Sequence, residues 1–240
     1  MRADAAAGAL SARWCFLFND GFILAAVVSV PNALTASRSQ LVAWLALGAT
    51  SICLYFAISM IGPGYVPKGR GRRPGASGGR RLSDRGGGRA DAAGSPDVVD
   101  VEMGTSRERL MSGREGCSRW CEQCQTEQKM RVKHCYKCQR CVYRFDHHCF
   151  WVGACVGEKN HVWFYWFLAT QSIMCMWTAV VFAEAFVDVS PWLNANWIQL
   201  LVVIDAGGVG LLPLGLWGYH TYLVLTGQTT WEDLRTRKIE

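Results

Sequence analysis

The chain has 240 residues, of which 50% are hydrophobic, and a formal net charge of +6. Its apolar residues gather in long blocks separated by a charged middle, which excludes an ordinary soluble globular domain. The positive charge does not indicate a nucleic-acid partner, because the basic residues alternate with membrane-type blocks rather than with base-stacking aromatics. We therefore expect a membrane protein that has no nucleic-acid partner.

The first apolar block predicts a transmembrane helix at about residues 14–34, within an N-terminal segment of residues 1–66. It contains Asn19 and Asp20, and an acidic residue inside a span is costly. A span that starts later, or an Asp20 at the membrane interface, explains these residues equally well. A cleaved signal peptide is another interpretation, since a basic residue precedes the apolar run. We favour a retained span, because no small-x-small cleavage site follows before Pro31.

Three further blocks predict transmembrane helices. Residues 41–62 carry no charge and would extend roughly 33 Å as a helix, which matches a bilayer core. Residues 162–187 begin with clustered aromatics, as helices do at a membrane interface. Residues 197–225 are long enough to cross, although Asp205 and Pro213 predict an irregular or kinked helix. The fold class is thus an α-helical polytopic membrane protein with four transmembrane helices.

Charge indicates the orientation of these spans. Most of the 25 Lys and Arg lie in the loop between the second and third spans, whereas residues 188–196 contain none. The positive-inside rule therefore places that loop and both termini in the cytosol. Residues 67–116, rich in Gly and Arg, predict a disordered linker. The second membrane domain, residues 162–226, leads into a short cytosolic tail, residues 227–240.

The rest of the central loop, residues 117–161, is a cysteine-rich domain. It contains eight of the 11 cysteines and four of the five histidines. Because the cytosol keeps thiols reduced, this density favours metal binding over disulfides. Cysteines separated by two residues present two thiolates to one tetrahedral Zn²⁺, and repeated pairs of this kind are a strong indication of zinc sites.

The number of candidate ligands exceeds the need of two zinc ions. Residues 121–155 contain ten cysteines and histidines, whereas two structural sites use eight. Adjacent ligands such as His147 and His148 point in divergent directions, so neighbours belong to different ions and the sites interleave. One consistent assignment gives Cys121, Cys124, His134 and Cys141 to one ion, and Cys135, Cys138, His148 and Cys155 to the other.

This assignment leaves His147 and Cys149 without an ion. At positions i and i+2 of an extended segment they lie on the same side, where the imidazole can accept the thiol proton or stabilise the thiolate. Asp146 could then orient His147, as the third member of a triad does. Spacing alone does not bring Asp146 to that ring, and it leaves open whether His147 or His148 is the free histidine.

Residues 121–164 resemble the cysteine-rich domain of the DHHC-type (zinc finger) protein S-acyltransferases, the palmitoyltransferases. The family pattern C-x2-C-x9-H-C-x2-C-x2-C-x4-D-H-H-C-x5-C-x4-N-x3-F is matched position by position, ending at Asn160 and Phe164. TTWE at residues 229–232 is similar to the family's TTxE motif, and GPGY at residues 62–65 is similar to its DPG motif.

The chain departs from the family pattern at three places. Gly62 replaces the Asp of DPG, Phe150 replaces the proline after the signature, and Gly153 with Ala154 replaces an Asn pair. Two of the departures flank the proposed nucleophile, so they bear on activity and acyl selectivity.

The resemblance implies an enzyme that moves a long acyl chain, usually palmitoyl, from coenzyme A to cysteine thiols of cytosol-facing proteins. The expected partners are acyl-coenzyme A, the lipid bilayer and protein substrates with juxtamembrane cysteines. The expected location is the Golgi or endoplasmic reticulum membrane. The alternative is a non-catalytic membrane zinc-binding scaffold that recruits cytosolic partners, but a scaffold needs no nucleophile beside a base.

The resemblance also implies roles for individual residues. Cys149 would be the acylated nucleophile, with His147 and Asp146 as the other catalytic residues. The remaining histidine of the signature would be a zinc ligand in the assignment above, and two structural zinc ions would be the cofactors. Trp151 and Thr230 are expected at the substrate-binding region, with Thr230 near Asp146.

Five residues in or beside the spans receive simpler interpretations. Cys15, Cys53 and Cys175 are interpreted as small apolar side chains. His161, where the third span begins, and His220, in the fourth, are interpreted as hydrogen-bonded interfacial residues rather than ligands.

Overall fold

A computed structural model describes most of the two membrane domains and the cysteine-rich domain, at residues 14, 16–27, 38–69 and 119–236. Nearly all of the predicted linker, and part of the first predicted span, lie outside these residues. The chain divides into two units, of which the larger comprises Met1–Pro67 and Arg131–Glu240 and the smaller comprises Lys68–Met130.

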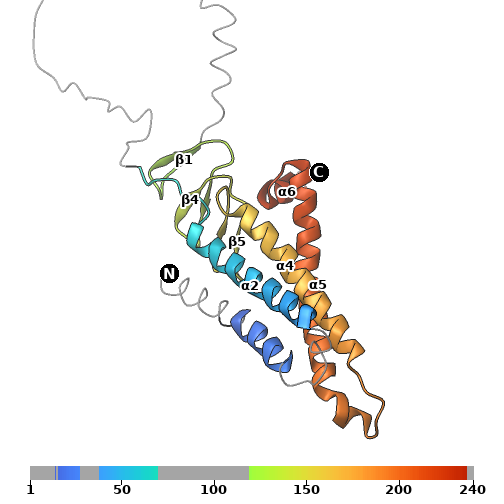
Figure 1. The fold of residues 1–240 in the computed structure, drawn as a ribbon. Coiled ribbons are helices and arrows are strands. Elements are labelled where there is room, and N and C mark those ends of the chain that lie inside the picture. Colours follow the sequence, from blue (N-terminus) through green and yellow to red (C-terminus); the bar gives the residue numbers. More distant parts are fainter. Residues whose placement is uncertain (1–13, 15, 28–37, 70–118, 237–240) are drawn as a thin grey trace, which may run out of the picture. The chain divides into compact units, whose positions relative to one another are not determined.

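Among the described residues of the larger unit, three helices are long and apolar enough to cross a membrane. They are α2 (Arg38–Ile61), α4 (His161–Glu184) and α5 (Trp192–Thr226). Figure 1 shows α4 running along α5 and beside α2, and α4 packs against both. By length and composition the chain is a multi-pass membrane protein.

The first predicted span is represented by a shorter apolar helix, Phe16–Val27. Ile23 and Val27 of this helix are buried in one cluster with Trp44 of α2 and Phe182 of α4. The short helix therefore packs onto the same bundle as the longer ones. Since residues 28–37 lie outside the described part of the chain, the four-span topology stays a prediction.

The longest helix begins earlier than predicted. α5 starts at Trp192 rather than near residue 197, directly after Pro191, which lies at the N-cap in an extended conformation. It ends at Gly227, whose φ of 67° forms a left-handed cap. The helix remains continuous at Pro213, so the predicted irregularity does not interrupt it.

Short antiparallel hairpins carry the cysteine-rich segment. The larger unit contains β3 (Lys133–Cys135) paired with β4 (Arg140–Val142), and β5 (His147–Cys149) paired with β6 (Ala154–Val156). The smaller unit contains β1 (Arg119–Cys121) paired with β2 (Thr126–Gln128). Isolated two-stranded hairpins are marginally stable in water. The hairpins of the larger unit therefore depend on packing against the rest of that unit for their stability.

Backbone pairing joins the β3–β4 hairpin to the segment that follows α2. Val66 N–H donates to the Cys141 carbonyl at 2.9 Å, and Tyr143 N–H donates to the Gly64 carbonyl at 2.9 Å. Gly64 has a φ of 85°, which glycine adopts without strain. The end of α2 and the cysteine-rich segment are thus parts of one packed structure.

Asn160, fully buried before α4, ties three segments together. Its side-chain amide donates to the carbonyls of Ile58 in α2 and Cys155 in β6, at 3.1 and 3.0 Å. Its Oδ1 accepts from Gly157 N–H at 2.9 Å. All these groups are satisfied away from water, so the start of α4 is held in place beside α2 and β6.

Gly157→Ala should destabilise the larger unit. A Cβ there would lie 2.7 Å from Val142 Cγ1 and 2.8 and 2.9 Å from the carbonyl oxygens of Pro63 and Tyr143, and the backbone atoms cannot rotate away. We expect the free energy of unfolding to fall by about 1–3 kcal/mol, measured by denaturant unfolding in detergent. Gly215→Ala is the control, because a Cβ at Gly215 meets nothing within 4 Å. Equal destabilisation by both substitutions would contradict the argument.

Candidate active site

Strand β5 divides the two histidines of the signature between its two faces. His148 pairs in register with Cys155 of β6, and His147 with Val156. Because side chains alternate along a strand, His147 and Cys149 lie on one face and His148 on the other. The extended conformation on which the argument about His147 and Cys149 depends is present at His147–Cys149.

One Cys/His group lies wholly within the larger unit. The ligand atoms of Cys135, Cys138, His148 and Cys155 all lie within 4.8 Å of one another, and His148 Nδ1 is 3.3 Å from Cys138 Sγ. Three thiols and one imidazole at this separation fit tetrahedral Zn²⁺.

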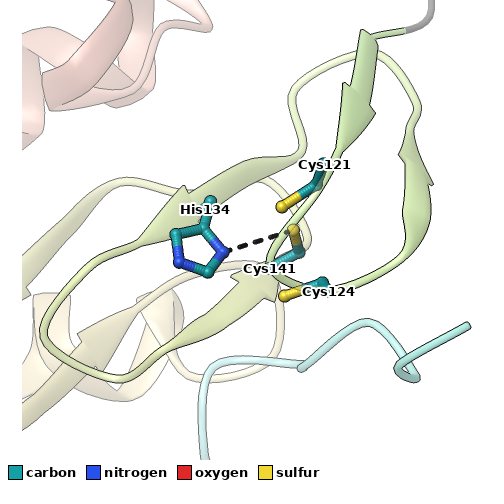
Figure 2. A group of neighbouring side chains, drawn as sticks. All are labelled: Cys121, Cys124, His134 and Cys141. Carbon is teal, nitrogen blue, oxygen red and sulfur yellow. Dashed lines mark hydrogen bonds between the residues drawn. The ribbon is translucent and has the colours of Figure 1, made fainter.

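The other four predicted zinc ligands belong to different units. In the larger unit, His134 and Cys141 pair in register across β3 and β4, with His134 Nδ1 3.8 Å from Cys141 Sγ. In the smaller unit, Cys121 and Cys124 are both buried, Cys121 at the end of β1 and Cys124 in the turn that follows. Figure 2 shows the four side chains. Three cysteines and one histidine are again the ligand types of a structural zinc site.

The two C-x2-C turns have the same local geometry. Gln125 and Gln139 follow the second cysteine with φ values of 50° and 53°, a left-handed conformation that is unusual for a residue other than glycine. Each glutamine amide donates to a carbonyl within its own turn, that of Glu122 or Tyr136. The Cys-x2-Cys-Gln pattern occurs twice in the sequence and indicates these turns. Counting the candidate ligands did not use this pattern.

Asp146 and His147 form the polar centre beside β5. His147 Nδ1 donates to Asp146 Oδ2 at 2.6 Å. Burial alone would raise the pKa of Asp146, but its hydrogen bonds with His147 and Thr230 lower that pKa to about 2. Burial likewise opposes a charge on His147, but hydrogen bonds with Asp146 and Cys149 raise its pKa to about 9. The site thus holds an ionised carboxylate and stabilises an imidazolium next to the thiol.

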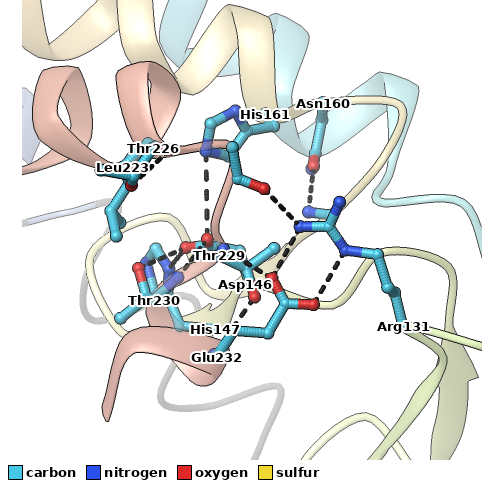
Figure 3. A network of polar contacts seen from close by, with 12 residues as sticks. Arg131, Asp146, His147, Asn160, His161, Leu223, Thr226, Thr229, Thr230 and Glu232 are labelled. Atoms are coloured by element: carbon cyan, nitrogen blue, oxygen red, sulfur yellow. Dashed lines mark hydrogen bonds and ion pairs between the residues drawn. The ribbon is translucent and has the colours of Figure 1, made fainter. Parts of the chain in front are cut away.

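Helix α6 (Thr230–Thr236) closes over the carboxylate of Asp146. Thr230 donates from its backbone N–H to Oδ1 and from Oγ1 to Oδ2, both at 2.8 Å. Glu232 accepts two bonds from the Arg131 guanidinium, at 2.8 and 2.6 Å, and one from Thr229 N–H at 2.9 Å. Figure 3 shows this network. The ion pair between Arg131 and Glu232, which sequence reasoning missed, holds α6 against the cysteine-rich segment.

An apolar cavity of about 360 Å³ adjoins Cys149. Its walls come from β5, the following turn, α4 and α5, and they include Trp151, Val152, Phe164, Phe167, Leu168, Leu212 and Leu216. Tyr55 of α2 donates its hydroxyl to the Trp151 carbonyl at 3.0 Å, which holds that turn. The volume and the lining are those of a small-molecule pocket, and the apolar walls suit an aliphatic chain.

Two histidines assigned to the membrane interface by sequence lie next to Asp146. His161 Nε2 is 3.9 Å from Asp146 Oδ1, and the His220 ring centre is 5.6 Å from that of His161. His220 is 2% exposed, and its Nδ1 has no hydrogen-bond partner among the described residues. The structure therefore corrects the prediction of a hydrogen-bonded interfacial His220. No sequence signal links positions 161 and 220, because the fold alone joins the ends of α4 and α5.

Comparisons with known proteins agree on one family. The DHHC palmitoyltransferase family model matches residues 115–237. Protein S-acyltransferase 10 of Arabidopsis thaliana is 38% identical over 50% of this chain and 35% of its own length. Palmitoyltransferase ZDHHC14 of Homo sapiens is 32% identical over 60% of this chain and 33% of its own length. Palmitoyltransferase ZDHHC18 of Rattus norvegicus is 36% identical over 54% of this chain and 35% of its own length. The alignments thus cover about a third of each relative.

Thr230→Val should weaken the anchoring of Asp146, because valine keeps the shape of threonine but removes the hydroxyl bond to Oδ2. A hydrogen bond to a charged group contributes about 1.5–3 kcal/mol, so the free energy of unfolding should fall by about that amount. Denaturant unfolding in detergent measures it. Thr230→Ser keeps the hydroxyl and should retain most of the stability. If serine and valine cost the same, the hydroxyl bond is not the source.

Proposed function

The chain belongs to the DHHC palmitoyltransferase family, and we propose that it transfers a long-chain acyl group, usually palmitoyl, from acyl-coenzyme A to cysteine thiols of cytosol-facing proteins. One observation carries the proposal. The hydrogen-bonded pair of Asp146 and His147 lies beside the Cys149 thiol, and Cys149 borders an apolar cavity between the membrane helices. A nucleophile, its base and a lipid-compatible pocket thus occur together.

In the proposed first step, His147 accepts the proton of the Cys149 thiol, and the thiolate attacks the carbonyl carbon of the acyl thioester. The carbon–sulfur bond to coenzyme A then breaks, and coenzyme A leaves as a thiol after His147 returns the proton. Asp146 keeps the imidazole oriented and stabilises its positive charge. The product of this step is an acyl thioester on Cys149.

In the second step, the thiol of a protein substrate gives its proton to His147 and attacks the carbonyl carbon of acyl-Cys149. The bond between that carbon and Cys149 Sγ breaks, and the proton returns to Cys149. The acyl group is now a thioester of the substrate protein, and the enzyme is regenerated. The sequence of steps is a ping-pong reaction with no net redox change.

The acyl chain would occupy the cavity beside Cys149. Burial of each methylene contributes about 0.8 kcal/mol, so an apolar pocket at membrane level retains a long chain between the two steps. Trp151 and Phe164 line this cavity near Cys149, which supports a substrate-binding role for Trp151. Thr230 acts instead through Asp146, which it holds by two hydrogen bonds.

Two zinc ions would stabilise the cysteine-rich domain. We assign one to the group of Cys135, Cys138, His148 and Cys155, and the other to Cys121, Cys124, His134 and Cys141. When bound, zinc cross-links the short hairpins and neutralises their thiolates. Four protein ligands leave no open coordination position, so these ions are structural rather than catalytic.

The proposed topology has four membrane helices with the termini and the zinc domain in the cytosol, in the Golgi or endoplasmic reticulum membrane. Its supports are the three long apolar helices, the packing of Phe16–Val27 onto them and the excess of Lys and Arg in the central loop. The domains would be residues 1–66, 67–116, 117–161, 162–226 and 227–240, of which the second is the disordered linker.

Labelled palmitoyl-coenzyme A tests the reaction on the purified full chain. Cys149→Ser should abolish the hydroxylamine-labile acyl label, because a serine hydroxyl is a far poorer nucleophile. His147→Ala should slow labelling by about 10²–10⁴-fold, and Asp146→Asn should fall between wild type and His147→Ala. Cys53→Ser, an exposed cysteine in α2, is the control and should keep full label. If Cys149→Ser also labels fully, the scaffold alternative replaces the enzyme.

Elemental analysis tests the zinc assignment with two adjacent histidines. His148→Ala should lower the zinc content from about two ions per chain toward one and destabilise the fold, because a structural site that loses one of its four ligands no longer closes around its ion. His147→Ala should keep about two ions. Cys135→Ser and Cys149→Ser form a second matched pair. Cys135→Ser should lower the zinc content toward one ion per chain, whereas Cys149→Ser should keep about two. A zinc loss in His147→Ala or Cys149→Ser would show that the assignment is wrong.

A further inference from the structure

Asp146, His161 and His220 converge beside the proposed catalytic pair. Their ligand atoms all lie within 4.8 Å of one another. Asp146 directly precedes β5, His161 is the first residue of α4 and His220 lies in the last two turns of α5. Figure 3 shows His161 directed at Asp146. Neither histidine has a role in the proposed acyl transfer, so the cluster calls for another explanation.

One oxygen of the Asp146 carboxylate, Oδ1, has a lone pair available on the side of His161. Oδ2 accepts from His147 at 2.6 Å and from the Thr230 hydroxyl at 2.8 Å. Oδ1 accepts from Thr230 N–H at 2.8 Å, and His161 Nε2, at 3.9 Å, is too far for a hydrogen bond. Each carboxylate oxygen offers two lone pairs. Oδ1 can therefore bind a cation without losing the contacts that hold Asp146.

His220 contributes a ring nitrogen to the same cluster, and its ring carries an unpartnered nitrogen. The residue is 2% exposed, and its Nδ1 has no hydrogen-bond partner within the described part of the chain. Its ring packs edge-on against Phe164 and at a tilt against His161, at centroid distances of 5.1 and 5.6 Å. A buried polar atom without a partner is an exception in folded proteins, and a bound ion that the ring ligates is one explanation of it. The packing also holds the ring in one orientation, as a metal ligand requires.

We propose that Asp146, His161 and His220 form a third metal site, separate from the two structural zinc sites, which takes a divalent transition-metal ion such as Zn²⁺. Two imidazoles and one carboxylate suit such ions. Bonds of about 2.0–2.1 Å in tetrahedral geometry place ligand atoms ~3.4 Å apart. The 3.9 Å pair therefore needs a small adjustment, and wider pairs, which lie within 4.8 Å, need a larger one. The side chain of His161 is 19% exposed and offers a path for the ion. Three protein ligands leave an open position for water, unlike the structural sites.

Occupation of this site would inhibit acyl transfer, a consequence that rests on the proposed function. An ion on Oδ1 draws negative charge from the carboxylate that orients His147 and stabilises its positive charge. The ion also places a second positive charge near the imidazolium, which is less stable as a result. The binding itself does not depend on whether the chain transfers acyl groups.

Cobalt spectroscopy tests the binding in the full-length Cys149→Ser variant with its structural zinc retained. Added Co²⁺ should bind in one further equivalent, with visible d–d absorption and no near-ultraviolet sulfur-to-cobalt charge transfer, because the site contains no thiolate. Zn²⁺ should displace it. His161→Gln, at the exposed side of the site, should weaken Co²⁺ binding at least tenfold, and His220→Gln should do the same. Tyr222→Phe, an exposed residue of α5, is the control and should bind Co²⁺ normally.

Two results would overturn the third site. One is sulfur-to-cobalt absorption with release of structural zinc, which would place the cobalt in the cysteine groups. The other is unchanged Co²⁺ affinity in folded His161→Gln. In the active chain, added Zn²⁺ should reduce acyl labelling, and His161→Gln should shift that inhibition to at least tenfold higher Zn²⁺. Because binding is measured in a variant without the nucleophile, a failure of the proposed function leaves the metal test intact.

Discussion

The buried carboxylate of Asp146 is the constraint on which the rest of the site depends. A charge removed from water is costly unless it is paired and hydrogen-bonded. Here His147 and Thr230 together donate three hydrogen bonds to the carboxylate. These donors lie in β5 and in α6. Satisfying the Asp146 carboxylate therefore requires α6 to pack against the cysteine-rich segment. The ion pair of Arg131 with Glu232 also holds α6 against the cysteine-rich segment.

Strand alternation separates the structural chemistry from the reactive chemistry within three residues. β5 turns His148 toward the cysteines of one group and turns His147 with Cys149 toward Asp146 and the cavity. A helix would spread these neighbours around its axis, whereas a strand assigns them to two opposite faces. The proposed nucleophile therefore sits directly beside a proposed metal ligand without sharing its ion. Because β5 carries both His148 and Cys149, unfolding of the β5–β6 hairpin would also displace the Cys149 thiol.

The membrane helices provide the apolar packing surface that the short hairpins lack. Short two-stranded hairpins bury little apolar surface, but β5 and the turn after it pack beside α2 and α4. Tyr55 binds the Trp151 carbonyl of that turn, and Asn160, just before α4, binds the carbonyls of Ile58 and Cys155. The same packing leaves the apolar cavity next to Cys149. The match of the DHHC family model to residues 115–237 and this cavity beside Cys149 both support the proposed acyl transfer.

The sequence by itself predicted the three long apolar helices and indicated two Cys/His groups, because both follow from local patterns. The uncharged run in α2 predicts a helix, and alternation along an extended segment puts His147 and His148 on opposite sides, but spacing left open which of the two is the free histidine. Only the tertiary structure decided that Asp146 reaches His147, and that His161 and His220 lie beside the same carboxylate. Those contacts join β5 with the ends of helices far along the chain. Long-range packing and the need to satisfy the buried charge of Asp146 produce these contacts. Local sequence patterns therefore cannot predict them.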